Sequence, residues 1–219
     1  MRQLLLLVLL VPTFALIPVS AQNGTILYAN GLPCSDSCVD AWSISQGSAV
    51  SDTFFVNGNA RVTGFEIYTW EFPGDKILTI QWAITSREFG GTIYGSGTVL
   101  ARSDVVLFFN DYGFNVDRVT VSGLNVEVPG GISWITLQNG IDEQQFGVYW
   151  DQNSGVGCHS PGCPSSASDN QVGMIPSESF DIHGVYLDGG DKPASAPIPT
   201  SAVYGSVPAG LAALKRILL

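Results

Sequence analysis

Four cysteines stand in two close pairs, and this spacing allows two kinds of chemistry. Three residues separate Cys34 from Cys38, and four separate Cys158 from Cys163. An even cysteine count in an exported chain predicts disulfides, and four cysteines allow three pairings. We favour two local bridges, each adding on the order of 2 kcal/mol at most, because each closes a short loop. The alternative is a tetrahedral zinc centre that also uses His159.

Asp151 and Asn153 are weak calcium candidates in a Gly-rich segment. Their side chains offer the hard oxygen ligands that Ca²⁺ prefers, and Asp36 or Asp40 could complete the cage. Asx residues also form turns without any metal. We therefore expect no required cofactor, with calcium as the open alternative.

The sequence offers few of the residues that nucleophilic catalysis needs. The chain contains two histidines, His159 and His183, and no Gly-x-Ser-x-Gly elbow. His159 lies between cysteines, where a loop role is expected, and His183 reads as a hydrogen-bonded structural residue in the last strand. We expect no catalytic residues and a non-enzymatic protein.

Paired carboxylates would indicate a glycosidase, which needs two carboxyl groups about 5–9 Å apart. Residues i and i+2 of one strand share a face, but no Glu-x-Asp or Glu-x-Glu falls within a predicted strand. Glu66 stands alone. The loop pair Asp142–Glu143 and the turn residues Glu71 and Asp75 are expected to lie on a solvated surface. A glycosidase without these patterns remains an alternative.

Aromatic residues offer a better basis for a binding function. Sugar-binding sites stack exposed rings against sugar faces, and the candidates are Trp42, Trp70, Trp82, Trp134, Tyr149 and Trp150. Alternation places Trp82 in the core, whereas Trp70 and Trp150 lie at strand ends beside polar loops and are expected to be the more exposed. The candidate ligand-binding residues are therefore Trp70, Tyr149, Trp150 and Asn153. The alternative is that Trp70 and Trp150 too are core residues, as most aromatic residues of a sandwich are.

The charge balance disfavours some partners. The formal net charge is −10, from 19 acidic and 9 basic residues. Removing residues 1–21 takes away Arg2 and no acid, which leaves −11. An acidic surface repels nucleic-acid phosphates and anionic lipids, so we expect neither as a partner.

The two ends of the chain read as targeting segments. Residues 1–21 combine a basic residue, an apolar run and a small-residue ending, which is typical of a secretory signal peptide. Residues 189–196 are rich in Gly, Pro, Ala and Ser and predict a linker. An apolar segment that ends in a basic pair follows within 197–219, and it suits either a membrane-stop signal or a short surface helix.

This tail resembles the PEP-CTERM sorting signal of exported proteins in Gram-negative bacteria. Residues 197–199 read Pro-Ile-Pro, small and apolar residues follow, and residues 215–216 read Lys-Arg. Ile198 replaces the central acid of the motif, so the tail is a degenerate version. Segments 40–44, 70–75 and 149–158 are also similar to exported proteins that carry such tails. The resemblance implies a secreted or cell-surface protein whose membrane contact is confined to the tail before processing, and it brings no catalytic residues.

Alternating apolar residues predict an all-β domain over residues 22–188. The predicted strands cover 48–56, 60–72, 77–85, 92–101, 105–110, 114–122, 131–139, 146–150 and 178–183. In the third of these, Leu78, Ile80, Trp82 and Ile84 should share the buried face. Turn residues separate the strands, and no long helical period interrupts them. About ten such strands predict an antiparallel sandwich of jelly-roll or Greek-key type.

One long segment departs from this pattern. Residues 151–176 are rich in Gly, Ser, Asn and Pro, which predicts a long loop that could carry a binding face. Taken together, the sequence predicts an exported, non-enzymatic cell-surface or matrix protein. A carbohydrate-binding module that contacts extracellular polysaccharide or envelope components is the alternative.

Overall fold

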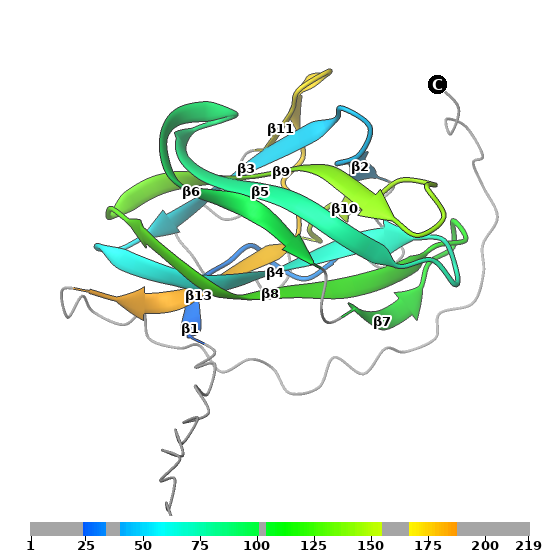
Figure 1. The fold of residues 1–219 in the computed structure, drawn as a ribbon, viewed down its shortest axis with the longest axis horizontal. Coiled ribbons are helices and arrows are strands. Elements are labelled where there is room, and N and C mark those ends of the chain that lie inside the picture. Colours follow the sequence, from blue (N-terminus) through cyan, green and yellow to red (C-terminus); the bar gives the residue numbers. More distant parts are fainter. Residues whose placement is uncertain (1–23, 34–39, 101–103, 155–166, 188–219) are drawn as a thin grey trace, which may run out of the picture.

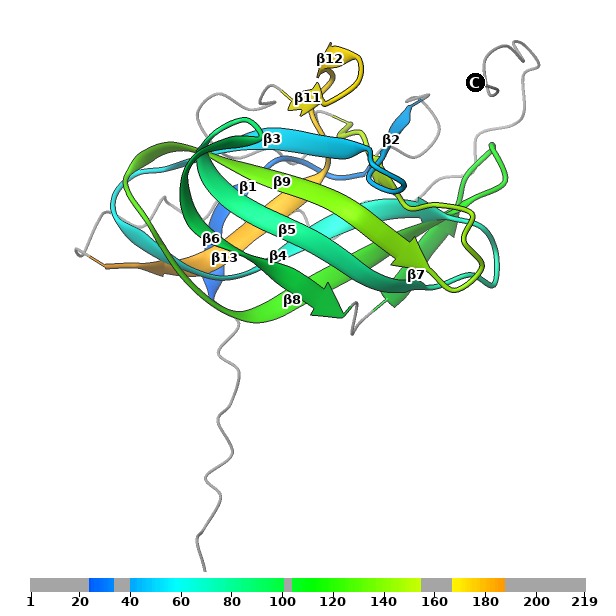
Figure 2. The same ribbon diagram turned by 45° about the horizontal axis from the view of Figure 1, so that its top comes forward.

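The computed structural model describes residues 24–33, 40–100, 104–154 and 167–187. These residues form two antiparallel sheets and no helix. Figures 1 and 2 show the two sheets lying one over the other. The prediction of an all-β antiparallel sandwich is confirmed.

The two sheets are of similar size. The seven-stranded sheet contains β1 (Thr25–Ala29), β2 (Ala41–Ser43), β4 (Ala60–Glu71), β7 (Asp104–Phe109), β8 (Asn115–Val128), β10 (Tyr149–Asp151) and β13 (Phe180–Tyr186). The six-stranded sheet contains β3 (Ala49–Val56), β5 (Ile77–Arg87), β6 (Gly90–Leu100), β9 (Gly131–Asp142), β11 (Ala167–Asp169) and β12 (Gly173–Ile175). Consecutive strands such as β3 and β4, or β8 and β9, lie in different sheets, so the chain repeatedly crosses the core.

Strand β4 organises the larger sheet. β8 pairs with it along one edge, from Ala60 to Glu71. On the other edge β13 pairs with the first part of β4, and β10 pairs with Thr69 and Trp70 near its end. β4 therefore carries the C-terminal strand at one end and the aromatic strand β10 at the other.

The core lies between the two sheets and follows the predicted alternation. Phe65 and Ile67 of β4 are fully buried, as are Ile135 and Leu137 of β9. Trp82, which alternation assigned to the core, belongs to the same buried cluster. Full burial of one such side chain stabilises the fold by roughly 1.5–3 kcal/mol.

One predicted core residue is exposed. Leu78 was expected to share the buried face of β5 with Ile80, but its side chain is 43 % exposed, whereas Ile77 is 3 % exposed. The register of β5 against β9 shifts between Ile77 and Thr79. This bulge adds one residue and exchanges the two faces locally, so simple alternation fails there.

The segment expected as one long loop contains short strands. β11 and β12 form a hairpin that extends the six-stranded sheet beyond β3, as Figure 2 shows. Residues 155–166 lie outside the described residues, as do the four cysteines, His159, the predicted signal peptide, the linker and the tail. Within the described part of the chain, no helix has the length and apolar character needed to cross a membrane.

Candidate functional site

Six aromatic side chains gather at the end of the sandwich where β4, β8 and β10 meet. Trp70 stacks on Tyr112 with ring centroids 5.5 Å apart, and it also contacts Phe114 at 5.6 Å. Phe72 contacts Phe114 at 4.6 Å and Phe146 at 4.9 Å. We call this group the aromatic surface; its members are Phe72, Tyr112, Phe114, Phe146 and Tyr149, with Trp70 beneath them.

Strand pairing brings these residues together from distant parts of the sequence. Tyr149 of β10 lies opposite Trp70 on one side of β4, and Val116 of β8 lies opposite Trp70 on the other. Phe114 precedes β8 directly, so it reaches the same end of the sheet. The outer rings are the accessible ones: Phe72, Tyr112 and Phe146 are 38 %, 37 % and 51 % exposed.

Buried polar side chains hold two of the three loops that carry the exposed rings. In the β7–β8 turn, the Oδ1 of Asn110 accepts hydrogen bonds from the backbone N–H groups of Tyr112 and Phe114, at 3.1 and 3.0 Å. In the loop before β10, Asp142 accepts from the N–H of Gly147, and Asp75 accepts from the N–H of Gln144 at 3.1 Å. The rings therefore stand on fixed backbone, which lowers the entropy lost when a ligand binds.

This arrangement corrects the expectation for the acidic turn residues. Glu71, Asp75 and Asp142 were expected to lie on a solvated surface, but all three are buried. Asp75 and Asp142 accept from backbone N–H groups that the turns leave unpaired, and burial strengthens those bonds. Glu71 instead accepts from the hydroxyl of Thr69 at 3.0 Å. The sequence shows the carboxylates but does not show which N–H groups face them.

The expectation that Trp70 and Trp150 are exposed is wrong. Trp70 is 6 % exposed and donates its indole N–H to Asp151 Oδ1 at 2.8 Å. Trp150 is fully buried, donates to the carbonyl of Ser179 at 2.9 Å and packs against Phe180. A buried Trp needs one acceptor for its N–H, and the polar residues beside these strand ends supply it. Tyr149 alone of the three predicted aromatic ligand residues stays partly accessible.

Asp151 and Asn153, the calcium candidates, are both buried and belong to a polar cluster around Asp52 and Glu178. Asp151 accepts from Trp70, and the side-chain amide of Asn153 faces the carbonyl of Glu178 at 3.4 Å. Asp52 of β3 is the centre of the cluster, since its Oδ2 accepts from Ser177 Oγ at 2.8 Å and from the N–H of Glu178 at 2.7 Å. These bonds tie β3, β10 and the start of β13 together.

Glu178 is the unexpected member of this cluster. Its side chain is fully buried, and neither carboxylate oxygen has a hydrogen-bond partner among the described residues. Burial raises the pKa of Glu178 well above its usual value, and the neighbouring carboxylates of Asp52, Asp151, Asp40 and Asp169 raise that pKa further. Both effects disfavour the ionised form of the Glu178 carboxyl, and a cation beside it would oppose them.

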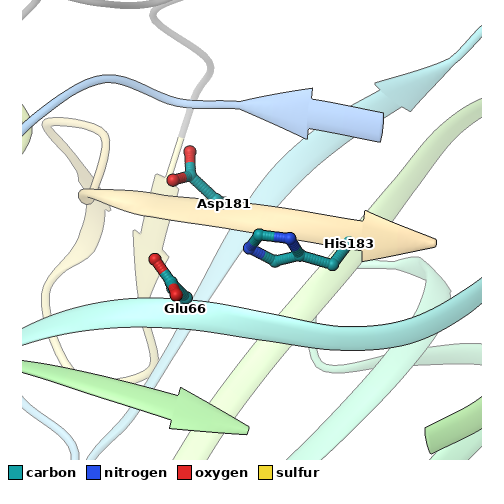
Figure 3. A group of neighbouring side chains, drawn as sticks. All are labelled: Glu66, Asp181 and His183. Atoms are coloured by element: carbon teal, nitrogen blue, oxygen red, sulfur yellow. The ribbon is translucent and has the colours of Figure 1, made fainter. Parts of the chain in front are cut away.

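A second titratable group lies on the outer face of the seven-stranded sheet. Glu66 of β4 lies directly opposite Asp181 of β13, and His183 follows two residues later on the same face. One ligand atom from each residue lies within 4.8 Å of the others. Figure 3 shows the imidazole of His183 extending along β13 toward the two carboxylates.

The electrostatics of this group are unfavourable without a cation. Burial raises the pKa of Asp181 to about 7, with a further increase from Glu66 and a smaller opposing effect from Arg118. The Nε2 of His183 is buried and has no hydrogen-bond partner within the described chain, so the expected hydrogen-bonded structural histidine is not found. Sequence reasoning treated Glu66 as isolated because it considered pairs within one strand, whereas this pair forms across two strands.

The described residues thus define an antiparallel β-sandwich with an aromatic surface at one end and a carboxylate–histidine group on one outer face. No protein-family model matches the chain, and no curated protein matches it.

Proposed function

We propose that this chain is an exported, non-enzymatic β-sandwich protein that acts at the cell surface or in the extracellular matrix by binding through its aromatic surface. The observation that carries the proposal is the exposure of Phe72, Tyr112 and Phe146 on one rigid aromatic cluster. Exposed apolar side chains that gather in one place are typical of interaction sites.

Extracellular polysaccharide is the ligand class that we favour. A sugar ring presents an apolar C–H face that stacks on an aromatic ring, and its hydroxyl groups bond to polar side chains nearby. Gln144 and Asp111 are exposed beside the rings and can supply such bonds. The buried Trp70 supports the stack from below instead of contacting the sugar, so the binding role passes to Phe72, Tyr112 and Phe146.

Export is supported by the sequence. The predicted signal peptide, the two cysteine pairs and the acidic composition all suit an extracellular protein. The degenerate PEP-CTERM-like tail adds the cell envelope of a Gram-negative bacterium as the proposed location.

The proposal is tested by retention on insoluble polysaccharides. The purified chain is mixed with cellulose, chitin and xylan, and the bound and free fractions are measured, together with any reducing sugar that is released. We expect retention on at least one of the three without sugar release. Release of reducing sugar would mean a glycosidase, and no retention on any of them would remove polysaccharide as the ligand.

A further inference from the structure

We propose that Glu66, Asp181 and His183 bind one divalent transition-metal ion, with zinc as the best-suited ion, on the outer face of the seven-stranded sheet. None of these residues belongs to the aromatic surface, so this proposal goes beyond the proposed function and does not depend on it. The ion would join β4 to the C-terminal strand β13.

Backbone pairing fixes the arrangement of the three residues. Phe65, Ile67 and Ile182 point into the core and are fully buried. Alternation therefore places Glu66, Asp181 and His183 together on the opposite face. Because β4 and β13 are paired neighbours, the backbone that carries the ligands is held by the sheet and not by a loop.

The distances suit a metal after small side-chain rotations. The three ligand atoms lie within 4.8 Å of one another. A tetrahedral zinc ion with bonds of about 2.0–2.2 Å needs ligand atoms roughly 3.4 Å apart. Closing this gap requires side-chain rotations, and an ion bound to Oε1 of Glu66 would share or replace the hydrogen bond that this atom accepts from Thr120 Oγ1 at 3.2 Å.

The donor set selects the kind of ion. One imidazole nitrogen and two carboxylate oxygens suit zinc and neighbouring transition metals, whereas calcium and magnesium prefer oxygen ligands alone. Three protein ligands leave at least one position open for water or for a group on another molecule.

The surroundings favour a bound cation. Glu66 and Asp181 are like charges directly opposite each other on paired strands, an arrangement that destabilises a sheet unless it is compensated. Arg118 on β8 compensates it in part. On the other side, β1 places the apolar Ile26 opposite His183, so that strand offers no competing partner for the imidazole.

Zinc binding is tested by thermal unfolding of the chelator-treated chain with and without zinc chloride. If bound zinc stabilises the folded chain, Tm should rise by about 5 °C or more when the free zinc concentration is 100 times its Kd. The rise should disappear in His183→Gln and shrink in Asp181→Asn. Magnesium at the same concentration should produce no comparable rise.

Two control variants separate this site from other zinc ligands in the chain. Glu143→Gln removes one exposed carboxylate elsewhere and should respond to zinc like the parent chain. His159→Gln removes the only other histidine, which lies between two cysteines, and it should also keep the response. A response that is absent in the parent, or that persists in His183→Gln, would overturn the proposal.

A measurement on the unsubstituted chain covers the case in which a variant does not fold. The two histidine imidazoles are followed by ¹⁵N NMR during zinc titration. We expect the His183 ring resonances to shift and the His159 resonances to stay in place. Unchanged His183 resonances would refute the site.

Discussion

Glu178 carries an energetic cost at neutral pH that the rest of its cluster does not offset. Asp52 accepts several hydrogen bonds, whereas the Glu178 carboxylate has no partner among the described residues. The carboxylates around it come from β3, β10, β11 and residue 40, so every described charged neighbour that shifts its pKa opposes ionisation. Burial and these neighbours therefore both favour the protonated form of Glu178.

Glu178→Gln should stabilise the protein at alkaline pH. The folded pKa of Glu178 lies above the ordinary value of 4.5, so its contribution to stability is greatest below that pH. That contribution falls as pH rises toward the folded pKa, by up to about 1.4 kcal/mol per pH unit. Urea unfolding at about pH 5 and pH 8 should show a smaller pH-dependent loss in the variant, with a gain at pH 8 on the order of 1–3 kcal/mol.

Calcium provides the control for this interpretation. If a cation instead neutralised Glu178, Asp151 and Asn153 would be its neighbours, and calcium would raise the Tm of the parent chain but not of Glu178→Gln. We expect calcium to leave both unchanged. A calcium-dependent rise confined to the parent would show that Glu178 is a ligand and not a neutral acid.

At the scale of elements, two bulges shape the strand pairs around β4. The register between β4 and β13 shifts at His183–Gly184, and the register between β4 and β8 shifts between Val62 and Gly64. A Cβ atom on Gly184 would collide with the backbone carbonyl of Arg61. Glycine is required there because two backbones approach closely.

Gly184→Ala should therefore destabilise the fold. The backbone of β4 cannot move aside without breaking its own pairing, so we expect a loss on the order of 2–4 kcal/mol in the free energy of unfolding. Gly58→Ala is the matched control, since a Cβ there meets nothing within 4 Å. Equal Tm values for the two variants would show that the close approach at Gly184 does not constrain the sheet.

Sequence reasoning predicted the strands better than it predicted their details. Alternation correctly placed Phe65, Ile67 and Trp82, because the period of two holds wherever a strand is regular. It failed at Leu78 because a bulge is not visible as a change in residue type. It also missed the opposition of Glu66 and Asp181, since pairing between strands 115 residues apart depends on topology.

Site prediction was weaker still, for a physical reason. Trp70 and Trp150 lie beside polar residues, which suggested exposure, yet both indole N–H groups are buried and donate to Asp151 Oδ1 and to the backbone carbonyl of Ser179, respectively. The aromatic surface contains three phenylalanines that carry no motif. Their role follows from three strands meeting at one end of the molecule, and only the fold shows that.

At the scale of the whole molecule, export makes a specific prediction about covalent structure. Chain recovered from the culture medium or periplasm should begin at Gln22, after cleavage behind Ala21, and should carry two disulfides. Intact mass spectrometry after alkylation without reductant should show no added label. Four labelled thiols, or an uncleaved N-terminus, would contradict the proposed compartment.

The sandwich presents apolar side chains in several places, so the aromatic surface must be compared with exposed apolar residues elsewhere. Ile132, Val172 and Met174 are 65 %, 64 % and 85 % exposed, and none belongs to the aromatic surface. Replacing these three by alanine removes a comparable apolar area and leaves the rings intact. That variant is the reference for the decisive comparison.

The most direct test measures retention of Phe72→Ala/Tyr112→Ala/Phe146→Ala on whichever of cellulose, chitin or xylan holds the parent chain. Each stacked ring contributes on the order of 1 kcal/mol, so the loss of three should weaken binding by about 100-fold. The Ile132→Ala/Val172→Ala/Met174→Ala variant should bind like the parent. Full retention of the aromatic variant, or an equal loss in both, would contradict binding through the aromatic surface.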